Sequence, residues 1–197
     1  MKKIYLFRHG ETDWNKANRI QCSVDTELNE KGIQQAKQNA EFLKNFGIEH
    51  IYSSPLKRAY ITGKTLADKI DVNIEIVDNL AEAKGGKYEG MEKSKIKEEF
   101  GEENYEKFFH SRGNLELSFP DGETKGEIRN RIFNAVNNIC KTTKYNTIAI
   151  ASHGFILREF LRALNFDDDS GLKNCEVIEA EFENNELKVI KRIKCEI

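Results

Sequence analysis

A near-continuous apolar run from Thr147 to Ala151 is the feature that most constrains the fold of this chain. A strand with one solvent-exposed face alternates apolar and polar residues, whereas an uninterrupted apolar run is typical of a central parallel strand covered on both faces. The run therefore predicts a sheet with a layer of helices on each side.

The rest of the chain alternates predicted strands and helices. Short apolar or β-rich segments predict strands at residues 4–7, 50–53, 73–77, 176–182 and 187–193. Helical spacing and capping residues predict helices over residues 29–46, 54–70, 92–110, 124–139 and 156–164. Asn184 and Asn185 separate the last two strands and favour a hairpin turn. This order predicts a single domain, residues 1–197, with an α/β fold: a three-layer α/β/α sandwich around a mixed, mostly parallel sheet.

Composition limits the possible partners and surroundings of the chain. Of its 197 residues, 39% are hydrophobic and 32% charged, and the net charge of −2 comes from interleaved positive and negative side chains. This pattern lacks the basic face of a nucleic-acid-binding protein, and no apolar run reaches the length of a membrane span. The four cysteines show neither CxxC nor disulfide-like spacing, so we expect free thiols and a cytoplasmic location. The sequence predicts no oligomeric state.

Arginines and histidines follow the ends of predicted strands. Arg8 and His9 follow the first strand, Arg58 lies in the first turn of the helix after the second, and His153 follows the central apolar run. Because parallel strands bring their carboxyl ends to one edge of a sheet, these side chains can converge there. Such a cluster needs a negative counter-charge. A phosphoryl group suits it, since guanidinium groups can grip its oxygens and an imidazole can attack phosphorus.

Six motifs resemble the histidine phosphatase superfamily, which has the phosphoglycerate mutase-like fold. They occur in the family's order between residues 4 and about 160. They are Arg8-His9-Gly10-Glu11-Thr12 with Trp14-Asn15, Ser53-Ser54-Pro55-Leu56 with Arg58-Ala59, Leu80-x-Glu82, Gly86 with Glu89-Gly90, Phe119-Pro120-x-Gly122-Glu123, and Ser152-His153-Gly154.

The resemblance implies a metal-independent phosphomonoester hydrolase without a cofactor, acting on a small phosphorylated metabolite. It implies that His9 is the nucleophile and forms a phosphohistidine, and that Glu82 protonates the leaving oxygen and then deprotonates water. By the same resemblance, phosphate binding falls to Arg8, Arg58, His153 and Asn15, and substrate binding to Gln21.

Other interpretations stay open beside this one. Glu11 or Glu89 could take the role given to Glu82, and a zinc site at the two histidines is possible, although adjacent arginines would repel the cation. A cofactor-dependent phosphoglycerate mutase is the nearest alternative. Ala83 stands where such mutases usually carry an arginine, which favours a phosphatase. A non-catalytic protein that binds a phosphorylated ligand is the alternative from another class.

Three residues depart from the family pattern. Gly85 stands where many relatives have an aromatic residue, Cys22 where glycine is common, and Glu27 where proline is usual. Without an aromatic side chain at Gly85, we expect a roomier pocket or a looser loop on the side of the leaving group. The Lys/Glu run from Glu92 to Lys107 is interpreted as a solvated helix face, and His110 as structural or exposed.

Overall fold

The computed structural model describes residues 1–166 and 170–194 and contains one six-stranded sheet. Its strand order is β3-β2-β4-β1-β5-β6. The first four strands in this order pair in parallel, and β5 and β6 are antiparallel, which confirms the predicted mixed sheet. The strands are β1 (Lys2–Arg8), β2 (His50–Ser53), β3 (Ile74–Ile76), β4 (Thr147–Ser152), β5 (Val177–Glu183) and β6 (Glu186–Ile193).

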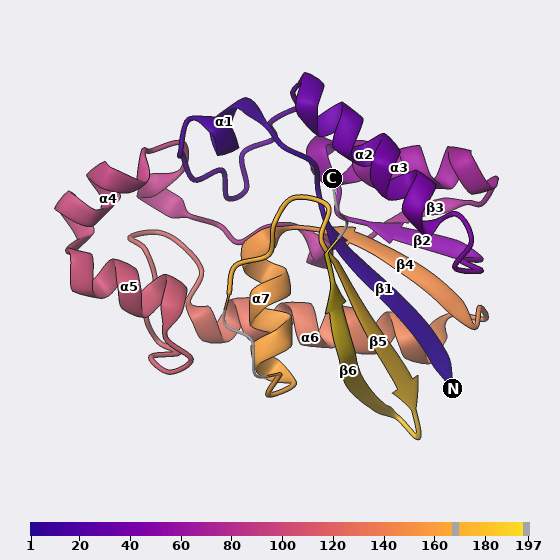
Figure 1. Cartoon of the computed structure of the whole chain (residues 1–197). Helices are drawn as coiled ribbons and strands as arrows, with labels where there is room; N and C mark the ends of the chain where they lie inside the picture. Colours follow the sequence, from indigo (N-terminus) through magenta and orange to yellow (C-terminus); the bar gives the residue numbers. More distant parts are fainter. Residues whose placement is uncertain (167–169, 195–197) are drawn as a thin grey trace.

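Helices cover both faces of the sheet, as the apolar run predicted (Figure 1). Successive side chains of a strand point to opposite faces. Accordingly, Ile148 and Ile150 of β4 belong to the core cluster on the side of α6 and α7, while Ala149 and Ala151 belong to the cluster under α2 and α3. Both layers are therefore anchored on the same buried strand. The helices are α2 (Glu30–Leu43), α3 (Lys57–Ile70), α6 (Lys125–Thr142) and α7 (Gly154–Ala163).

Local signals set several of these boundaries. The Asn29 side chain accepts the Gly32 N–H and begins α2, and Thr124 with Glu127 forms the predicted capping box of α6. Asn184 and Asn185 have φ values of 53° and 64°, the left-handed conformation that a tight hairpin turn requires.

Three boundaries differ from the sequence prediction. The segment predicted as a loop from Glu11 to Leu28 contains one helical turn, α1 (Asp13–Lys16), which Thr12 caps. Helix α3 begins at Lys57, because the Ser54 hydroxyl accepts the Leu56 N–H in a turn before the helix. The charged segment forms two helices, α4 (Lys93–Phe100) and α5 (Glu102–His110), since Gly101 adopts a φ of +86° between them.

The parallel register places two strand ends at the same level. Arg8 of β1 is the partner of Ser152 of β4, so His9 and His153 leave the sheet side by side. In Figure 1 the ends of β1 and β4 meet near the centre of the view, with α1 above them and α4 and α5 to the left. The sheet edge where we expected the functional side chains is thus flanked by these short helices.

Candidate active site

His9 is buried, and its ring has a defined orientation. Its Nδ1 lies 2.7 Å from the Gly10 carbonyl oxygen. Because a carbonyl only accepts, this nitrogen carries the proton in the neutral ring and Nε2 keeps its lone pair. Burial, followed by the charges of Arg8 and Arg58, holds the pKa of His9 well below its usual value. The imidazole is therefore neutral and has a nucleophilic nitrogen at neutral pH.

His153 lies directly behind His9. The two ring centroids are 5.3 Å apart, and His153 Nε2 lies 2.7 Å from the Ser54 hydroxyl oxygen. His153 is fully buried, and its Nδ1 has no hydrogen-bond partner among the described residues. Burial and the charge of Arg58 hold the pKa of His153 well below its usual value. The structure therefore brings the two histidines together, with His153 in the deeper position.

Two buried guanidinium groups lie beside these rings. Arg8 donates through Nη1 to the Leu172 carbonyl, at 2.6 Å. Arg58 donates to the carbonyls of Val24 and Cys22, at 2.7 and 2.8 Å. Burial lowers the pKa of both arginines, that of Arg58 to about 10. The Nε of each is buried with no acceptor in the described protein. A phosphoryl oxygen is the kind of acceptor that such donors fit.

The glycine after His153 provides room for one of these guanidinium groups. A Cβ atom at Gly154 would lie 3.1 Å from Arg8 Nε and 3.3 Å from its Cζ. These distances are shorter than ordinary van der Waals contacts between heavy atoms. A larger residue at position 154 would therefore require the Arg8 guanidinium to shift from its position.

Glu82 is held by the amino end of α7. Its two carboxylate oxygens accept the N–H groups of Phe155 and Ile156, each at 3.1 Å. Unpaired N–H groups at the start of a helix stabilise a negative charge. The other two acids that we considered serve the surrounding loops: Glu11 accepts from Lys31 and Asn29, and Glu89 from the N–H of Gly85.

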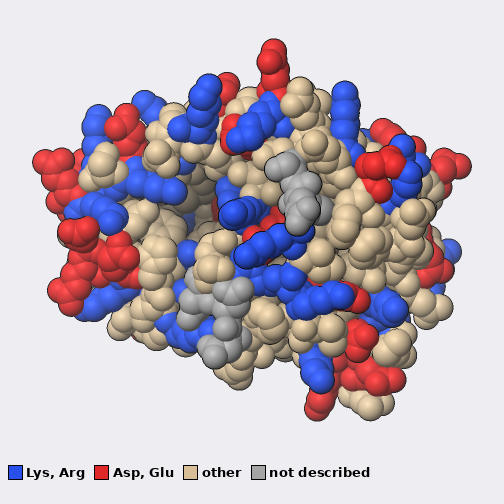
Figure 2. All heavy atoms as spheres, in the orientation of Figure 1, with Lys and Arg blue, Asp and Glu red and all other residues tan. Residues whose placement is uncertain are grey.

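A cavity of about 330 Å³ opens at this edge of the sheet. Figure 2 shows Lys and Arg side chains gathered around a hollow in this face of the molecule. Of the predicted site residues, the cavity is lined by Arg8, His9, Asn15, Gln21, Arg58 and Glu82. His153 does not line it. Among the described residues, Glu82 is the only carboxylate in the lining.

Asn15 and Gln21 also make hydrogen bonds that stabilise their own loop. Asn15 Oδ1 accepts the backbone N–H of Thr12 at 3.2 Å and completes the cap of α1. Gln21 Oε1 accepts the Thr26 hydroxyl, whose oxygen in turn lies 3.4 Å from Arg58 Nη1. In each amide the oxygen is engaged within the loop. The NH₂ group is the part that remains to donate to a ligand.

The outer half of the cavity was missed by sequence analysis. Its wall consists of aromatic side chains from α5, the following loop and α7: Tyr105, Phe108, Phe109, Phe119 and Phe155. Arg158 lies over this wall, with its Cζ 5.2 Å from the centroid of the Phe155 ring. Phe155 and Arg158 are one turn apart on the helix that follows His153, and this spacing was the available signal. Most charged side chains of the run from Glu92 to Lys107 are exposed, as expected, and so is His110. Lys93 and His110 also line the cavity, which sequence analysis did not predict.

Two departures from the family pattern are neighbours in space. Gly85 and Cys22 both line the cavity, and a Cβ atom at position 85 would lie 2.4 Å from Cys22 Sγ. The cysteine side chain therefore occupies the space that a side chain at position 85 would need. The roomier pocket that the absence of an aromatic residue suggests is partly filled by the thiol.

Neither a metal centre nor a membrane span is found in the part of the chain that the structure describes. There, no group of three or more His, Cys, Asp or Glu side chains is placed to bind a metal ion. No helix in residues 1–166 and 170–194 is long and apolar enough to cross a membrane. Cys22 and Cys140 are free thiols, and Cys195 lies outside the described residues.

The family model of the histidine phosphatase superfamily (branch 1) matches residues 4–195. Phosphoserine phosphatase 1 of Hydrogenobacter thermophilus is 30% identical over 164 residues, which cover 83% of this chain and 76% of that protein. Phosphoglycerate mutase-like protein 4 of Arabidopsis thaliana is 35% identical over 161 residues, which cover 79% of this chain and 68% of the relative.

A solved structure of a mutant phosphoserine phosphatase from Entamoeba histolytica, in complex with phosphoserine, has the same fold. Its TM-score is 0.83 at 28% sequence identity, and the match covers 100% of this chain and 98% of that one. The site and the fold thus define a phosphatase of the phosphoglycerate mutase-like type, which confirms the predicted fold and enzyme class. The chain belongs to the histidine phosphatase superfamily, branch 1.

Proposed function

We propose that this protein hydrolyses a small phosphomonoester through a phosphohistidine at His9. The observation that carries the proposal is the orientation of His9: Nδ1 is held by the Gly10 carbonyl, and the ring lies among buried cationic side chains. Nε2 attacks phosphorus, and the bond between phosphorus and the leaving oxygen breaks. Arg8 and Arg58 stabilise the negative charge that the phosphoryl oxygens carry in the transition state.

Glu82 supplies and then removes a proton in this scheme. In the first step it protonates the leaving oxygen, so the product departs as an alcohol. In the second step the resulting carboxylate takes a proton from water, whose oxygen attacks the phosphohistidine and regenerates His9. The N–H groups of Phe155 and Ile156 fix the carboxylate in the cavity between these steps.

The substrate class is supported by the relatives as well as by the cavity. The named relatives are a phosphoserine phosphatase and a phosphoglycerate mutase-like protein. A related solved structure of the Entamoeba histolytica phosphoserine phosphatase contains 3-phosphoglyceric acid. Lys93 and Arg158 at the outer part of the cavity suit a leaving group that carries a carboxylate. Phosphoserine and phosphoglycerates are therefore the first substrates to test.

The test separates hydrolysis from isomerisation. The protein is incubated with phosphoserine, and with 3-phosphoglycerate in the presence and absence of 2,3-bisphosphoglycerate, while phosphate and 2-phosphoglycerate are measured together. Phosphate without the isomer is the expected result. Isomer that appears only with the bisphosphate would replace the proposal by a mutase, and binding without either product would replace it by a phospho-ligand-binding protein.

Variants connect the reaction to the proposed residues. His9→Ala is expected to abolish both phosphate release and the acid-labile phosphoprotein seen after quenching. Glu82→Gln is expected to lower kcat by about 100-fold or more, the usual contribution of a positioned general acid. Glu11→Gln is the matched control, because Glu11 is tied to Lys31 outside the cavity. Full turnover by His9→Ala would refute the phosphohistidine.

A further inference from the structure

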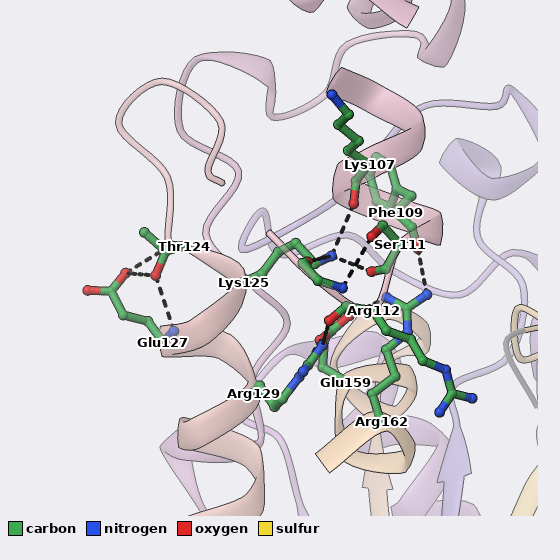
Figure 3. Close-up of polar contacts among 11 residues, drawn as sticks. Lys107, Phe109, Ser111, Arg112, Thr124, Lys125, Glu127, Arg129, Glu159 and Arg162 are labelled. Carbon is green, nitrogen blue, oxygen red and sulfur yellow. Dashed lines mark hydrogen bonds and ion pairs between the residues drawn. The ribbon is translucent and has the colours of Figure 1, made fainter. Parts of the chain in front are cut away.

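A buried charged cluster lies behind the aromatic wall of the cavity (Figure 3). Glu159 of α7 is fully buried and accepts from Arg162 at 2.6 Å and from Arg129 at 2.8 Å. Lys125, at the start of α6, is also fully buried. None of these four side chains lines the cavity, and the proposed reaction uses none of them.

The cluster binds backbone carbonyls of one segment, residues 107–113. Lys125 Nζ donates to the carbonyls of Lys107 and Gly113, at 3.0 and 2.9 Å, and also to that of Ser111. Two arginines of the cluster extend this pattern (Figure 3). Arg162 donates to the Phe109 carbonyl at 3.2 Å, and Arg129 to the Arg112 carbonyl at 3.0 Å.

The carbonyls need these donors because α5 ends at His110. The last four carbonyls of a helix have no partner within it, and cations near a helix C-terminus satisfy them and oppose the helix dipole. Without these donors, several partly buried carbonyls of the segment would lack a hydrogen-bond partner, which is costly. Lys125 alone satisfies three of them, so it is the main attachment of the segment to α6.

The same segment carries part of the cavity wall. Phe108 and Phe109 lie within it, and their rings pack against Phe155 at centroid distances of 5.1 and 5.2 Å. Both rings line the cavity, as does His110. A displacement of the backbone at residues 107–113 would therefore move the surface that faces the leaving group, while Arg8 and His9 stay in place at the end of β1.

We propose that Lys125 is a positioning residue, which fixes the aromatic wall and thereby sets the affinity of the cavity for the leaving-group part of the substrate. The inference rests on the proposed function in one respect, since it takes the wall to be the leaving-group side of a phosphomonoester site. The proposal makes a selective prediction. Loss of Lys125 weakens the binding of ligands that reach the aromatic wall and leaves unchanged the binding of ligands that occupy only the phosphoryl site.

Two probes separate these parts of the cavity without requiring turnover. Inorganic phosphate occupies the phosphoryl site alone, and phenylphosphonate, which is not hydrolysed, adds a ring that reaches the wall. We compare their Kd values by calorimetry in wild type, in Lys125→Met and in the control Lys141→Met, whose lysine is exposed on the same helix. In Lys125→Met, phenylphosphonate is expected to bind about tenfold more weakly, equivalent to about 1.4 kcal/mol, with the Kd of phosphate unchanged.

The charge of Lys125 gives a second readout. Burial lowers the pKa of Lys125 to about 8, with Glu159 opposing this shift and Arg162, Arg129 and Arg158 adding to it. Glu159 and these three arginines are the charged side chains of α6 and α7 that face the Lys125 ammonium. On α5, the pKa of His110 is lowered, so this ring stays neutral there, and the Lys107 ammonium is paired with Glu103 on the outer face.

Above about pH 8 the Lys125 amine has two protons for three carbonyls, so the attachment weakens. In wild type the phenylphosphonate Kd is then expected to rise relative to that of phosphate as the pH increases. Phosphate and phenylphosphonate are both dianions in this pH range, so the ratio of their Kd values does not depend on their own ionisation. In Lys125→Arg, which stays charged, the ratio is expected not to change with pH.

Several results would overturn the proposal. These are an unchanged ratio in a folded Lys125→Met, an equal loss of affinity for both probes, and a wild-type ratio that does not depend on pH. If Lys125→Met does not fold, the pH dependence of wild type and of Lys125→Arg decides the question. Because the readout is binding, a protein that binds the probes but releases no phosphate would refute the proposed reaction without refuting this role of Lys125.

Discussion

The contact between Gly85 and Cys22 predicts that the two positions are energetically coupled. A Cβ atom at position 85 would lie 2.4 Å from Cys22 Sγ, 2.9 Å from Cys22 Cβ and 3.1 Å from Glu89 Cγ. Carbon and sulfur atoms pack at roughly 3.5–4 Å, so Gly85→Ala leaves the new methyl group about 1 Å too close to the thiol. The backbone at Gly85, with a φ of −94°, accepts alanine. The cost therefore comes from overpacking alone.

The expected magnitudes follow from these contacts. Overpacking of this kind lowers the free energy of unfolding by about 1–3 kcal/mol, which is the expectation for Gly85→Ala. Cys22 has a φ of 48°, a left-handed conformation that costs a non-glycine residue about 1 kcal/mol. Cys22→Gly removes this strain along with the packing of the thiol, so we expect a change within about 0.5 kcal/mol. The double variant removes the clash and regains most of the stability that Gly85→Ala loses.

The coupling is measured by a double-mutant cycle, in which urea unfolding gives the free energy of unfolding of wild type, both single variants and the double variant. The expected interaction energy is about 1–3 kcal/mol in favour of the pair. Gly113→Ala is the matched control, because the nearest atom to its Cβ would be 3.8 Å away. If the two substitutions change the free energy of unfolding additively, the Cys22 thiol can move aside without loss of stability, and the packing argument is refuted.

Three further predictions concern charge, geometry and capping. Because the pKa values of His9 and His153 lie well below the usual value, acid protonates these rings first in the unfolded chain. The free energy of unfolding should therefore fall with acidification below about pH 6.5, by up to about 1.4 kcal/mol per pH unit for each histidine, and His153→Gln should flatten this slope in urea titrations. Arg58→Lys keeps the positive charge but loses the paired N–H donors of the guanidinium group, so it should lower kcat/KM at least about tenfold. Wild-type kinetics in this variant would refute the role of Arg58 in binding the phosphoryl oxygens. Thr124→Ala should lower the free energy of unfolding by about 1 kcal/mol and leave KM unchanged, in contrast to Lys125→Met.

Sequence alone determined the layers of the fold and the inner half of the site. The uninterrupted run from Thr147 to Ala151 requires cover on both faces, and a strand buried in this way has few possible surroundings. The residues that follow strand ends were predictable for a similar reason. Parallel strands share one carboxyl edge, so the positions of His9, His153 and Arg58 in the chain already imply that they meet.

Tertiary structure alone decided the outer half. The aromatic wall comes from α5, the loop after it and α7, and nothing in the local spacing of Phe108 or Phe119 indicates that they share a cavity with Phe155. The attachment of residues 107–113 is equally invisible in the sequence. A lysine in the first turn of an amphipathic helix is normally a surface charge, and only the packing of α5 against α6 and α7 buries Lys125 among carbonyls. The local sequence pattern determines which face of a helix or strand is apolar. Contacts between elements that are distant in the sequence determine which polar atoms become buried between them.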